Sequence, residues 1–283
     1  MINFRDFVHM EMANEPHYMV IGHPIGHSLS PLMHGVALEE CDMEARYHAI
    51  DLLPDELNSF LAWVNRDSFL GANITIPYKQ DFLLAVDRLD DAAREIGAVN
   101  TLVKRKGELI GYNTDAAGFQ APLEPWREVL EGGSAILFGT GGASLAVRYA
   151  LRQLGMKQLI MVSRNPDRIN VEDAICCNYQ NWQTYAGQSD LIVNTTPLGM
   201  SPNRESSPVQ DQDVGLLEGT ICYDLVYNPL ETRFLQQAKE AGAEVIDGLE
   251  MFIGQGDRAF ELWTGHRFPW KKVKERVRED LAS

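Results

Sequence analysis

The chain has few cysteines, no long apolar run and fewer basic than acidic residues. Its four cysteines form no C-x-x-C pair, so neither a zinc site nor a disulfide framework is expected. No stretch approaches the roughly 18 consecutive apolar residues of a membrane span, and the first residues lack the pattern of a secretory signal. With 25 Lys and Arg against 40 Asp and Glu, the net charge of −15 disfavours nucleic acid. We therefore expect a cytoplasmic protein that uses no metal and binds neither membrane nor nucleic acid.

What the chain does have is the composition of a globular protein. It contains 283 residues, of which 45% are hydrophobic and 23% charged, and this length suggests two domains. Residues 1–17 are polar and poorly patterned, so we expect them to form an N-terminal extension. The basic segment Lys271–Arg278 alternates with valines at helical spacing, which predicts a terminal amphipathic helix.

A glycine-rich turn lies within Ser134–Ala146, where an apolar run breaks into Gly139-Thr140-Gly141-Gly142 and then resumes at helical spacing. The pattern predicts a strand, a tight turn and a helix. Glycines let a phosphate approach the backbone closely, and the following helix presents free N–H groups to the anion. The small Ala143 lets the helix pack closely. Because the spacing is G-x-G-G rather than G-x-G-x-x-G, an ordinary strand-to-helix turn is the alternative.

The next apolar run, Gln158–Ser163, has strand length and leads directly to Arg164. In dinucleotide-binding folds an acidic residue at this point selects NAD, whereas arginine accommodates the 2′-phosphate of NADP. Ser163 and Asn165 can hydrogen-bond the phosphate or ribose, and Arg168 lies one helical turn further on. We predict an NADP site here. The alternative is that Arg164 is a solvated loop residue.

The first part of the chain alternates strand and helix patterns. We predict strands over Tyr18–Gly22, Arg46–Leu52 and Phe69–Lys79, a helix over Pro54–Asn65, and a β-hairpin of Thr101–Lys104 with Leu109–Tyr112 across Lys106-Gly107. Asn73 and Thr75 stand two apart and therefore lie on one face of their predicted strand. Polar groups on an otherwise apolar strand need partners.

Two hydroxyls, Ser28 and Ser30, precede Pro31, where a helix is expected to begin. Hydroxyl donors near a helix N-terminus can hold a carboxylate without a positive side chain. For Ser30, helix capping is the alternative. Three nearby histidines lack the carboxylate or cysteine that would complete a metal-ligand set.

Lys79 and Asp115 have simple structural explanations when each is taken alone. A lysine beyond a strand end is usually a solvated charge, and Asp115 precedes a predicted helix, where it can serve as N-cap. The helix dipole would also hold the carboxylate ionised, which suits pairing with a lysine.

The later part of the chain continues the nucleotide-binding pattern. Thr195 follows a buried-strand run, Asp190–Asn194, at the carboxyl end where ligands bind in open α/β sheets. Further strands are predicted over Thr220–Val226 and Ala243–Ile246. Gly199–Gly215, rich in Pro, Ser and Asp, is predicted to be a mobile loop near the cofactor.

From Gly248 the chain is predicted to be helical again. Gly254-Gln255-Gly256 lies inside this helix, where each glycine costs about 1 kcal/mol relative to alanine. Small residues flanking a glutamine indicate the close approach of a ligand or another backbone.

Eight motifs together resemble the shikimate dehydrogenase family. In order they are HPIGHSLSP, GANITIPYK, IGAVNTL, GYNTDAAGF, FGTGGAS, VNTTPLGM, YDLVYNPLET and GLEMFIGQG. The resemblance extends over nearly the whole chain from Tyr18. It implies an α/β fold with an N-terminal substrate domain, residues 18–117 with 248–283, and a Rossmann-type NADP-binding domain, residues 118–247. The last helices would return to the first domain.

The resemblance also implies an activity and a set of site residues. The activity is reversible reduction of 3-dehydroshikimate to shikimate with NADPH, in aromatic amino acid biosynthesis. Lys79 and Asp115 would form the catalytic pair. The substrate-binding residues would be Ser28, Ser30 and Tyr227 at the carboxylate, and Thr75, Asn100 and Gln255 at the ring hydroxyls. The cofactor-binding residues would be Gly139, Gly141, Gly142 and Ala143 at the pyrophosphate and Arg164 with Arg168 at the adenosine phosphate; Ser163, Asn165 and Thr195 complete the predicted set.

One departure from the family concerns the cofactor. Where the family commonly has Asn-Arg-Thr, this chain has Ser163-Arg164-Asn165, so NADP stays favoured and NAD stays an alternative. Two other functions stay open: a quinate/shikimate dehydrogenase using NAD or NADP, and a non-catalytic cofactor-binding regulator. Quinate-specialised members tend to carry threonine at the second serine, so Ser30 favours shikimate. We expect a monomer or homodimer.

Overall fold

The computed structural model describes residues 2–169 and 171–282 and divides into two compact units. The first unit comprises the chain up to Thr114 and again from Gln255 onward, and the second comprises Asp115–Gly254. The chain therefore leaves the first unit once and returns to it within a helix, α10 (Leu249–Thr264). Both units combine helices with a β-sheet, and the second unit is of the Rossmann type. The predicted α/β fold class is therefore confirmed.

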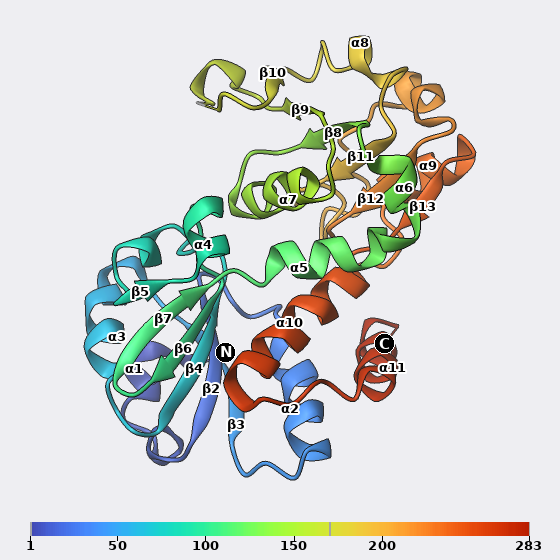
Figure 1. Cartoon of the computed structure of the whole chain (residues 1–283). Coiled ribbons are helices and arrows are strands. Elements are labelled where there is room, and N and C mark those ends of the chain that lie inside the picture. Colours follow the sequence, from blue (N-terminus) through green and yellow to red (C-terminus); the bar gives the residue numbers. More distant parts are fainter. Residues whose placement is uncertain (1, 170, 283) are drawn as a thin grey trace. The chain divides into compact units, whose positions relative to one another are not determined.

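The first unit is built on a mixed sheet. Its described strands are β1 (Ile2–Asn3), β2 (His17–Gly22), β3 (Arg46–Asp51), β4 (Phe69–Ile74), β5 (Arg88–Leu89), β6 (Thr101–Arg105) and β7 (Glu108–Tyr112). They lie in the order β1-β3-β2-β4-β6-β7-β5. Figure 1 shows this order from β3 to β5. The pairs among β1 to β4 are parallel, whereas β6 is antiparallel to both β4 and β7. The predicted hairpin is therefore confirmed, and Lys106 and Gly107 both have the positive φ that its two-residue turn requires.

Helices cover both faces of this sheet. They are α1 (Phe4–Phe7), α2 (Ser30–Glu40), α3 (Leu57–Trp63), α4 (Asp91–Ile96), the second part of α10 and α11 (Trp270–Leu281). Met19 of β2 packs in one apolar cluster with residues of α1 and α3. On the other face, Trp263 of α10 stacks on Tyr18 of β2, with 4.7 Å between ring centroids. Because both faces are covered, β2 is buried along its whole length.

The N-terminal residues are not the extension that the sequence predicted. Ile2 and Asn3 form β1, which pairs with the edge of β3, and Phe4 and Phe7 of α1 are buried in the core. Phe7 packs edge-on against Trp63 at 5.6 Å. These elements have two and four residues, too short for the periodicity that predicts a strand or helix.

Two elements of the first unit are shorter than predicted. Strand β4 ends at Ile74, and Thr75–Lys79 forms a turn rather than the end of the strand. The helix predicted from Pro54 begins with a 3-10 turn and is α-helical only over Leu57–Trp63. The carboxyl end of β4 is therefore available to a functional loop.

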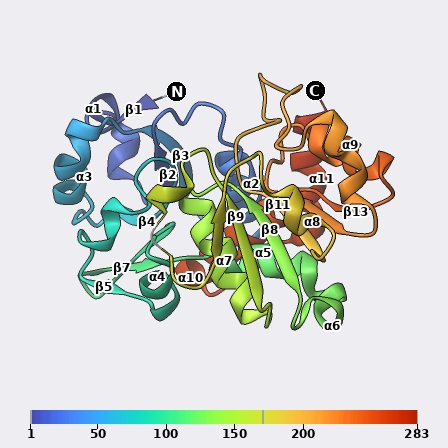
Figure 2. The same cartoon turned by 90° about the horizontal axis from the view of Figure 1, so that it is seen from above.

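The second unit is built on a parallel sheet. Its described strands are β8 (Ser134–Phe138), β9 (Gln158–Val162), β10 (Ile175–Cys177), β11 (Leu191–Asn194), β12 (Ile221–Asp224) and β13 (Glu244–Ile246). They lie in the order β10-β9-β8-β11-β12-β13, and every pair is parallel. Figure 2 shows β9, β8 and β11 side by side. Numbered along the chain, this is the order 3-2-1-4-5-6 of dinucleotide-binding folds.

The helices of the second unit pack on both faces of its sheet. They are α5 (Asp115–Gln120), α6 (Arg127–Leu130), α7 (Gly142–Gln153), α8 (Gln183–Ala186), α9 (Arg233–Glu240) and the first part of α10. Phe138 of β8 packs with Trp182 and Phe234 in one core cluster. Tyr223 of β12 stacks on Phe119 of α5 at 4.8 Å. The predicted loop 199–215 contains neither α-helix nor strand, but its end belongs to a 3-10 helix, Asp211–Leu217.

No helix among the described residues combines the length and the apolar character needed to cross a membrane.

Protonation of buried histidines is expected to limit stability in acid. His34 of α2 is fully buried and stacks on Tyr47 at 4.3 Å, and burial lowers the pKa of His34 to about 3 from 6.5. Between these values the unfolded chain binds a proton at His34 that the native chain does not. The contribution of His34 to the free energy of unfolding is therefore fully present above pH 6.5 and is lost progressively as the pH falls toward 3. At pH 5, about 1.5 pH units below the unfolded pKa, the loss is about 2 kcal/mol.

Urea unfolding at pH 7 and pH 5 measures this loss. His34→Phe keeps an aromatic ring without a titrating group, so this variant is expected to lose about 2 kcal/mol less than the parent between the two pH values. The exposed His266 provides a control, since His266→Asn should lose as much as the parent. An equal loss in His34→Phe and the parent would remove His34 from the acid response.

Candidate active site

Polar residues gather at one edge of the seven-stranded sheet. Because β2 and β4 are parallel and β6 and β7 alternate in direction, the carboxyl ends of β2, β4 and β7 share an edge with the amino end of β6. Ser30 follows β2, Lys79 follows β4, Asn100 precedes β6 and Thr114 follows β7. Four segments far apart in sequence are thereby brought to one edge.

A buried hydrogen-bond network leads from β3 to this edge. The Tyr47 hydroxyl donates to Asn73 Oδ1 at 2.7 Å, and Asn73 Nδ2 donates to Thr101 Oγ1 at 3.2 Å. Thr101 Oγ1 donates to Asn100 Oδ1 at 2.9 Å, and Asn100 Nδ2 donates to Thr114 Oγ1 at 2.9 Å. All five side chains are buried. The network fixes the orientation of the Asn100 amide, which is a predicted substrate-binding group.

Ser28 and Ser30 lie where β2 leads into α2. Ser30 is the first residue of α2, and the N-cap position belongs to Leu29, which makes no side-chain cap. The capping alternative for Ser30 is therefore wrong. Ser28 Oγ accepts from the Ser30 N–H at 3.3 Å. The side chain of Ser30 is hydrogen-bonded to Tyr47. Burial raises the pKa of Tyr47 well above its usual value, and the hydrogen bond to Ser30 opposes this shift only in part. The second serine is thus joined to the buried network.

Thr75 and Lys79 lie on the turn that follows β4. The Thr75 N–H donates to the Ile21 carbonyl at 3.0 Å, and the Val99 N–H donates to the Lys79 carbonyl at 2.7 Å. Between them, the buried Tyr78 donates its hydroxyl to the Leu52 carbonyl. These bonds hold the half-buried Lys79 beside the segment that carries Asn100.

Asp115 is the first residue of α5 and is buried, with 5% of the residue exposed. The sequence predicted that it would precede the helix as N-cap, but it lies one position inside. Asp115 belongs to the second unit and Lys79 to the first.

The glycines that flank Gln255 make room for protein neighbours. A Cβ at Gly254 would lie 3.2 Å from Gly118 Cα, and a Cβ at Gly256 would lie 2.3 Å from Met33 Cε. The predicted close approach of another backbone is therefore confirmed at Gly254, whereas at Gly256 it is wrong, because the close neighbour there is a side chain of α2. Since Met33 lies one turn after Ser30, Gly256 lets α10 pack against the helix that begins at Ser30.

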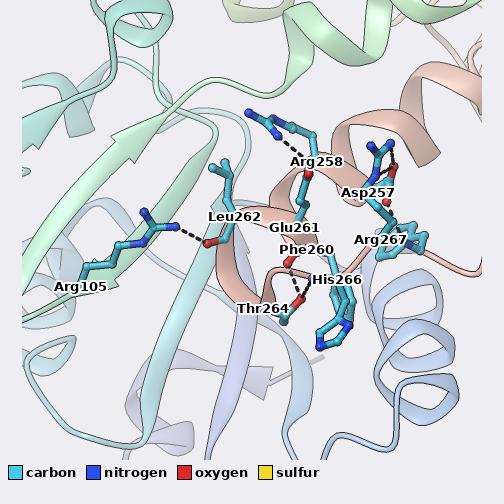
Figure 3. Close-up of polar contacts among 10 residues, drawn as sticks. Arg105, Asp257, Arg258, Phe260, Glu261, Leu262, Thr264, His266 and Arg267 are labelled. Carbon is cyan, nitrogen blue, oxygen red and sulfur yellow. Dashed lines mark hydrogen bonds and ion pairs between the residues drawn. The ribbon is translucent and has the colours of Figure 1, made fainter.

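An ion pair next to Gln255 fastens α10 to the chain that follows it. Asp257 is buried and accepts from Arg267 Nε at 2.8 Å (Figure 3). It also accepts from the Phe268 N–H at 2.7 Å. Further along α10, the Arg105 guanidinium donates to the Leu262 carbonyl at 2.8 Å. These contacts link α10, the helix that carries Gln255, to β6 and to the segment before α11.

In the second unit, the glycine turn follows β8 as predicted. Gly139 has φ +111°, and a Cβ there would lie 2.6 Å from Thr195 Oγ1. Thr195 in turn donates its hydroxyl to the Phe138 carbonyl at 2.7 Å. The turn after β8 and the loop after β11 are therefore packed together at the point where the strand order reverses, which is where ligands bind in this fold.

The helix after the turn presents its N-terminus at this point. Gly141 is the N-cap of α7, and Gly142 and Ala143 form its first turn. A Cβ at Gly141 would meet nothing within 4 Å. The protein itself therefore does not require glycine at this position, whereas a phosphate group lying close to the backbone would.

The segment after β9 carries the predicted adenosine-phosphate clamp. Arg164, Asn165 and Arg168 are exposed, and the Ser163 hydroxyl accepts from the Asn165 N–H at 3.2 Å. Within residues 2–169 and 171–282, no carboxylate pairs with either guanidinium. Two cations thus stand at the carboxyl end of β9 in a chain of net charge −15.

Tyr227 lies on the loop that follows β12. Its ring stacks on Phe252 of α10 with 4.2 Å between centroids. Just before it, the fully buried Asp224 accepts from Asn194 Nδ2 at 3.0 Å and from Thr232 Oγ1 at 2.6 Å. Burial raises the Asp224 pKa to about 7, and the hydrogen bonds from its neighbours partly oppose this shift.

The sequence does not indicate several polar residues that lie at these edges or are hydrogen-bonded to them. They are Tyr47, Thr101 and Thr114 in the first unit and Asn194 and Asp224 in the second. Thr114, Asn194 and Asp224 stand inside motifs that were recognised, so motif membership could have indicated them. Nothing in the pattern of its strand marks Tyr47.

Comparison with known proteins gives matches over most of the chain. The family model "Shikimate dehydrogenase substrate binding domain" matches residues 20–102, and "Shikimate 5'-dehydrogenase C-terminal domain" matches residues 248–278. A shikimate dehydrogenase (NADP(+)) of Bacillus cereus (strain B4264) is 39% identical over 274 residues, which covers 94% of this chain and 98% of the relative.

Solved structures agree with the sequence matches. A shikimate 5-dehydrogenase from Thermus thermophilus in complex with NADP(H) and shikimate has 36% identity and a TM-score of 0.81, covering 93% of this chain and 99% of that one. A shikimate 5-dehydrogenase from Listeria monocytogenes in complex with shikimate and NAD has 28% identity and a TM-score of 0.83, covering 93% and 96%.

Proposed function

Because this chain belongs to the shikimate dehydrogenase family, we propose that it is an enzyme that reversibly reduces 3-dehydroshikimate to shikimate with NADPH. The observation that carries the proposal is the polar edge of the seven-stranded sheet, where Ser30, Lys79 and Asn100 lie on neighbouring segments. Hydroxyl, amide and ammonium groups are the donors and acceptors that a polyhydroxy acid requires.

We assign the substrate contacts on the side of the first unit to residues of this edge. Ser28 and Ser30 would donate to the carboxylate near the N-terminus of α2, where the helix dipole also favours an anion. Thr75, Asn100 and Gln255 would bind the ring hydroxyls. From the second unit, Tyr227 would contribute its hydroxyl to the carboxylate.

We assign the cofactor contacts to the carboxyl edge of the six-stranded sheet. Gly139, Gly141, Gly142 and Ala143 would hold the pyrophosphate, and the open space beside Gly141 supports this assignment. Ser163, Arg164, Asn165, Arg168 and Thr195 complete the set. Arg164 and Arg168 would bind the 2′-phosphate, for which guanidinium groups are well suited. NADPH, when bound, supplies the hydride.

The proton chemistry is assigned to Lys79 and Asp115. As an ammonium, Lys79 would polarise the C3 carbonyl of 3-dehydroshikimate and protonate the alkoxide that develops there. In the reverse direction, neutral Lys79 would remove the hydroxyl proton. Asp115 would keep the lysine charged and oriented. General acid–base catalysis of this kind contributes about 10²- to 10⁴-fold.

Steady-state kinetics with two acids and two cofactors tests the function. With shikimate or quinate as substrate and NADP⁺ or NAD⁺ as oxidant, we expect the highest kcat/KM for shikimate with NADP⁺. A higher kcat/KM for quinate would instead assign the chain to quinate/shikimate dehydrogenases. Tight NADP binding without turnover of either acid would identify a non-catalytic regulator.

Exchange of Ser30 for threonine is expected to shift specificity from shikimate toward quinate. Quinate carries an extra hydroxyl on the carbon that bears the carboxylate, and Ser30 is a buried residue at the start of α2. An added methyl narrows the hydroxyl rotamers and fills space near the anion. One methyl group in a pocket is worth about 10- to 200-fold in kcat/KM ratio, which is the upper limit expected here.

The kcat/KM ratio for the two acids measures this shift. Ser68→Thr is the matched control, because Ser68 precedes β4 at the opposite edge of the sheet and donates to the Ala13 carbonyl. If Ser30→Thr lowers both activities in equal proportion, Ser30 binds a feature that the two acids share and does not determine specificity.

A cytoplasmic location and a monomeric or homodimeric state stay predictions from the sequence.

A further inference from the structure

One carboxylate oxygen at the carboxyl edge of the six-stranded sheet accepts hydrogen bonds from the last residue of β11 and from the loop after β12. Asp224 ends β12 and lies directly opposite Asn194, which ends β11. Asp224 Oδ1 accepts from Asn194 Nδ2 at 3.0 Å and from the Val226 N–H at 3.0 Å. The first donor belongs to the segment that leads to Thr195, and the second immediately precedes Tyr227.

The bond from Asn194 fixes the orientation of its amide. With its nitrogen directed to Asp224 and to the Leu198 carbonyl, at 3.1 Å, its oxygen is left to face Thr196. Asn194 Oδ1 accepts from the Thr196 N–H at 3.0 Å and from its hydroxyl at 2.6 Å. If the Asn194 amide were turned the other way, its NH₂ group would face the Thr196 N–H and its oxygen would face the Leu198 carbonyl. A donor would then face a donor and an acceptor would face an acceptor. The Asp224 carboxylate, which has no donor when ionised, therefore determines the conformation of the loop that carries Thr195.

The second oxygen of Asp224 is held from another direction. Thr232 Oγ1 donates to Asp224 Oδ2 at 2.6 Å and accepts from the Leu235 N–H at the start of α9. Asp224, Asn194 and Thr232 are all completely buried. Water is therefore no substitute for these partners, and the carboxylate cannot rotate without breaking a bond to one of the loops.

The loop after β12 is confined on its other side by α10. A Cβ at Gly248 would lie 2.4 Å from the Leu225 carbonyl oxygen, and Tyr227 stacks on Phe252. The Val226 N–H donates the hydrogen bond that fixes the backbone between these two packing contacts. We propose that Asp224 is a positioning residue that sets the cofactor residue Thr195 and the substrate residue Tyr227 in one arrangement. This inference rests on the proposed function, which assigns those two residues to their ligands.

Steady-state kinetics of the variant Asp224→Asn, compared with those of the control variant Asp190→Asn, tests the proposal. The amide has the size of the carboxylate but offers one acceptor oxygen instead of two, so at least one buried donor loses its partner. Asp190 is a matched control, because its carboxylate accepts the Ser134 N–H at 2.9 Å just before β11, at the opposite edge of the same sheet.

We expect Asp224→Asn to raise KM for shikimate and KM for NADP⁺ together, each by about 10-fold, the size of one lost hydrogen bond to a charged group. Asp190→Asn should leave both KM values unchanged while lowering the melting temperature. A role in stability alone would reduce the amount of active enzyme and hence kcat, without moving either KM. Parental KM values in Asp224→Asn would overturn the proposal.

A pair of variants at Thr232 covers the case in which Asp224→Asn does not fold. Thr232→Ser keeps the hydroxyl that orients the carboxylate and should retain parental KM values, whereas Thr232→Val removes it and should raise both. Parental KM values in Thr232→Val would overturn the proposal. If the parent itself does not oxidise shikimate, the proposed function fails, and this outcome is distinct from a failure of the role of Asp224.

Discussion

Replacing Lys79 by alanine is expected to lower kcat by at least about 100-fold with only a modest change in KM. The reason is that a proton donor acts mainly in the transition state, so its loss affects turnover more than substrate binding. The structure supports this choice, since the turn that carries Lys79 is tied to Val99, next to Asn100, by a 2.7 Å backbone hydrogen bond. Steady-state kinetics of shikimate oxidation measures the effect.

The control for this experiment is an exposed lysine of the same unit to which no catalytic role is assigned. Lys271 of α11 is 89% exposed, and its nearest carboxylate, Glu275, is 4.0 Å away. Lys271→Ala should therefore retain the parental kcat. An unchanged kcat in Lys79→Ala would remove Lys79 from the mechanism and leave the proton donor to be sought elsewhere.

Replacing Arg164 by alanine is expected to raise KM for NADP⁺ by about 10- to 150-fold, because a charge-assisted hydrogen bond contributes about 1.5–3 kcal/mol. KM for NAD⁺ should change little, since NAD⁺ has no 2′-phosphate. Arg164 is exposed at the carboxyl end of β9, beside the turn that holds Gly139. A cation without a carboxylate partner among the described residues has its full charge available to a phosphate.

Arg127 offers the comparison for this variant. It belongs to α6, which leads into the amino end of β8, and it forms an ion pair with Glu124 at 2.9 Å. Arg127→Ala should leave KM for both cofactors unchanged. Equal losses of NADP⁺ and NAD⁺ affinity in Arg164→Ala would show that this arginine does not bind the 2′-phosphate.

Features that depend on residues close together in the chain could be predicted from the sequence. Alternating and helical apolar patterns identified β2, β3, β8, β9, β11 and α7, because strand and helix periods are properties of a continuous segment. The turn at Gly139, with φ +111°, was predictable because glycine reaches that conformation at little cost. Arg164 was found from its place after a recognisable strand.

Which candidate groups contact one another, and which residues orient them, depends on the tertiary structure. The partners Tyr47, Asn73, Thr101 and Thr114 are separated by many residues, and their hydrogen bonds depend on the order and direction of β3, β4, β6 and β7. The N-terminal residues became part of the core because Phe4 and Phe7 found an apolar surface on α3, which their own short segments could not reveal. Asp224 and Asn194 face each other through the register of β11 and β12. Register, strand order and burial arise only when distant segments pack, so the positions of these side chains could not be read from local pattern.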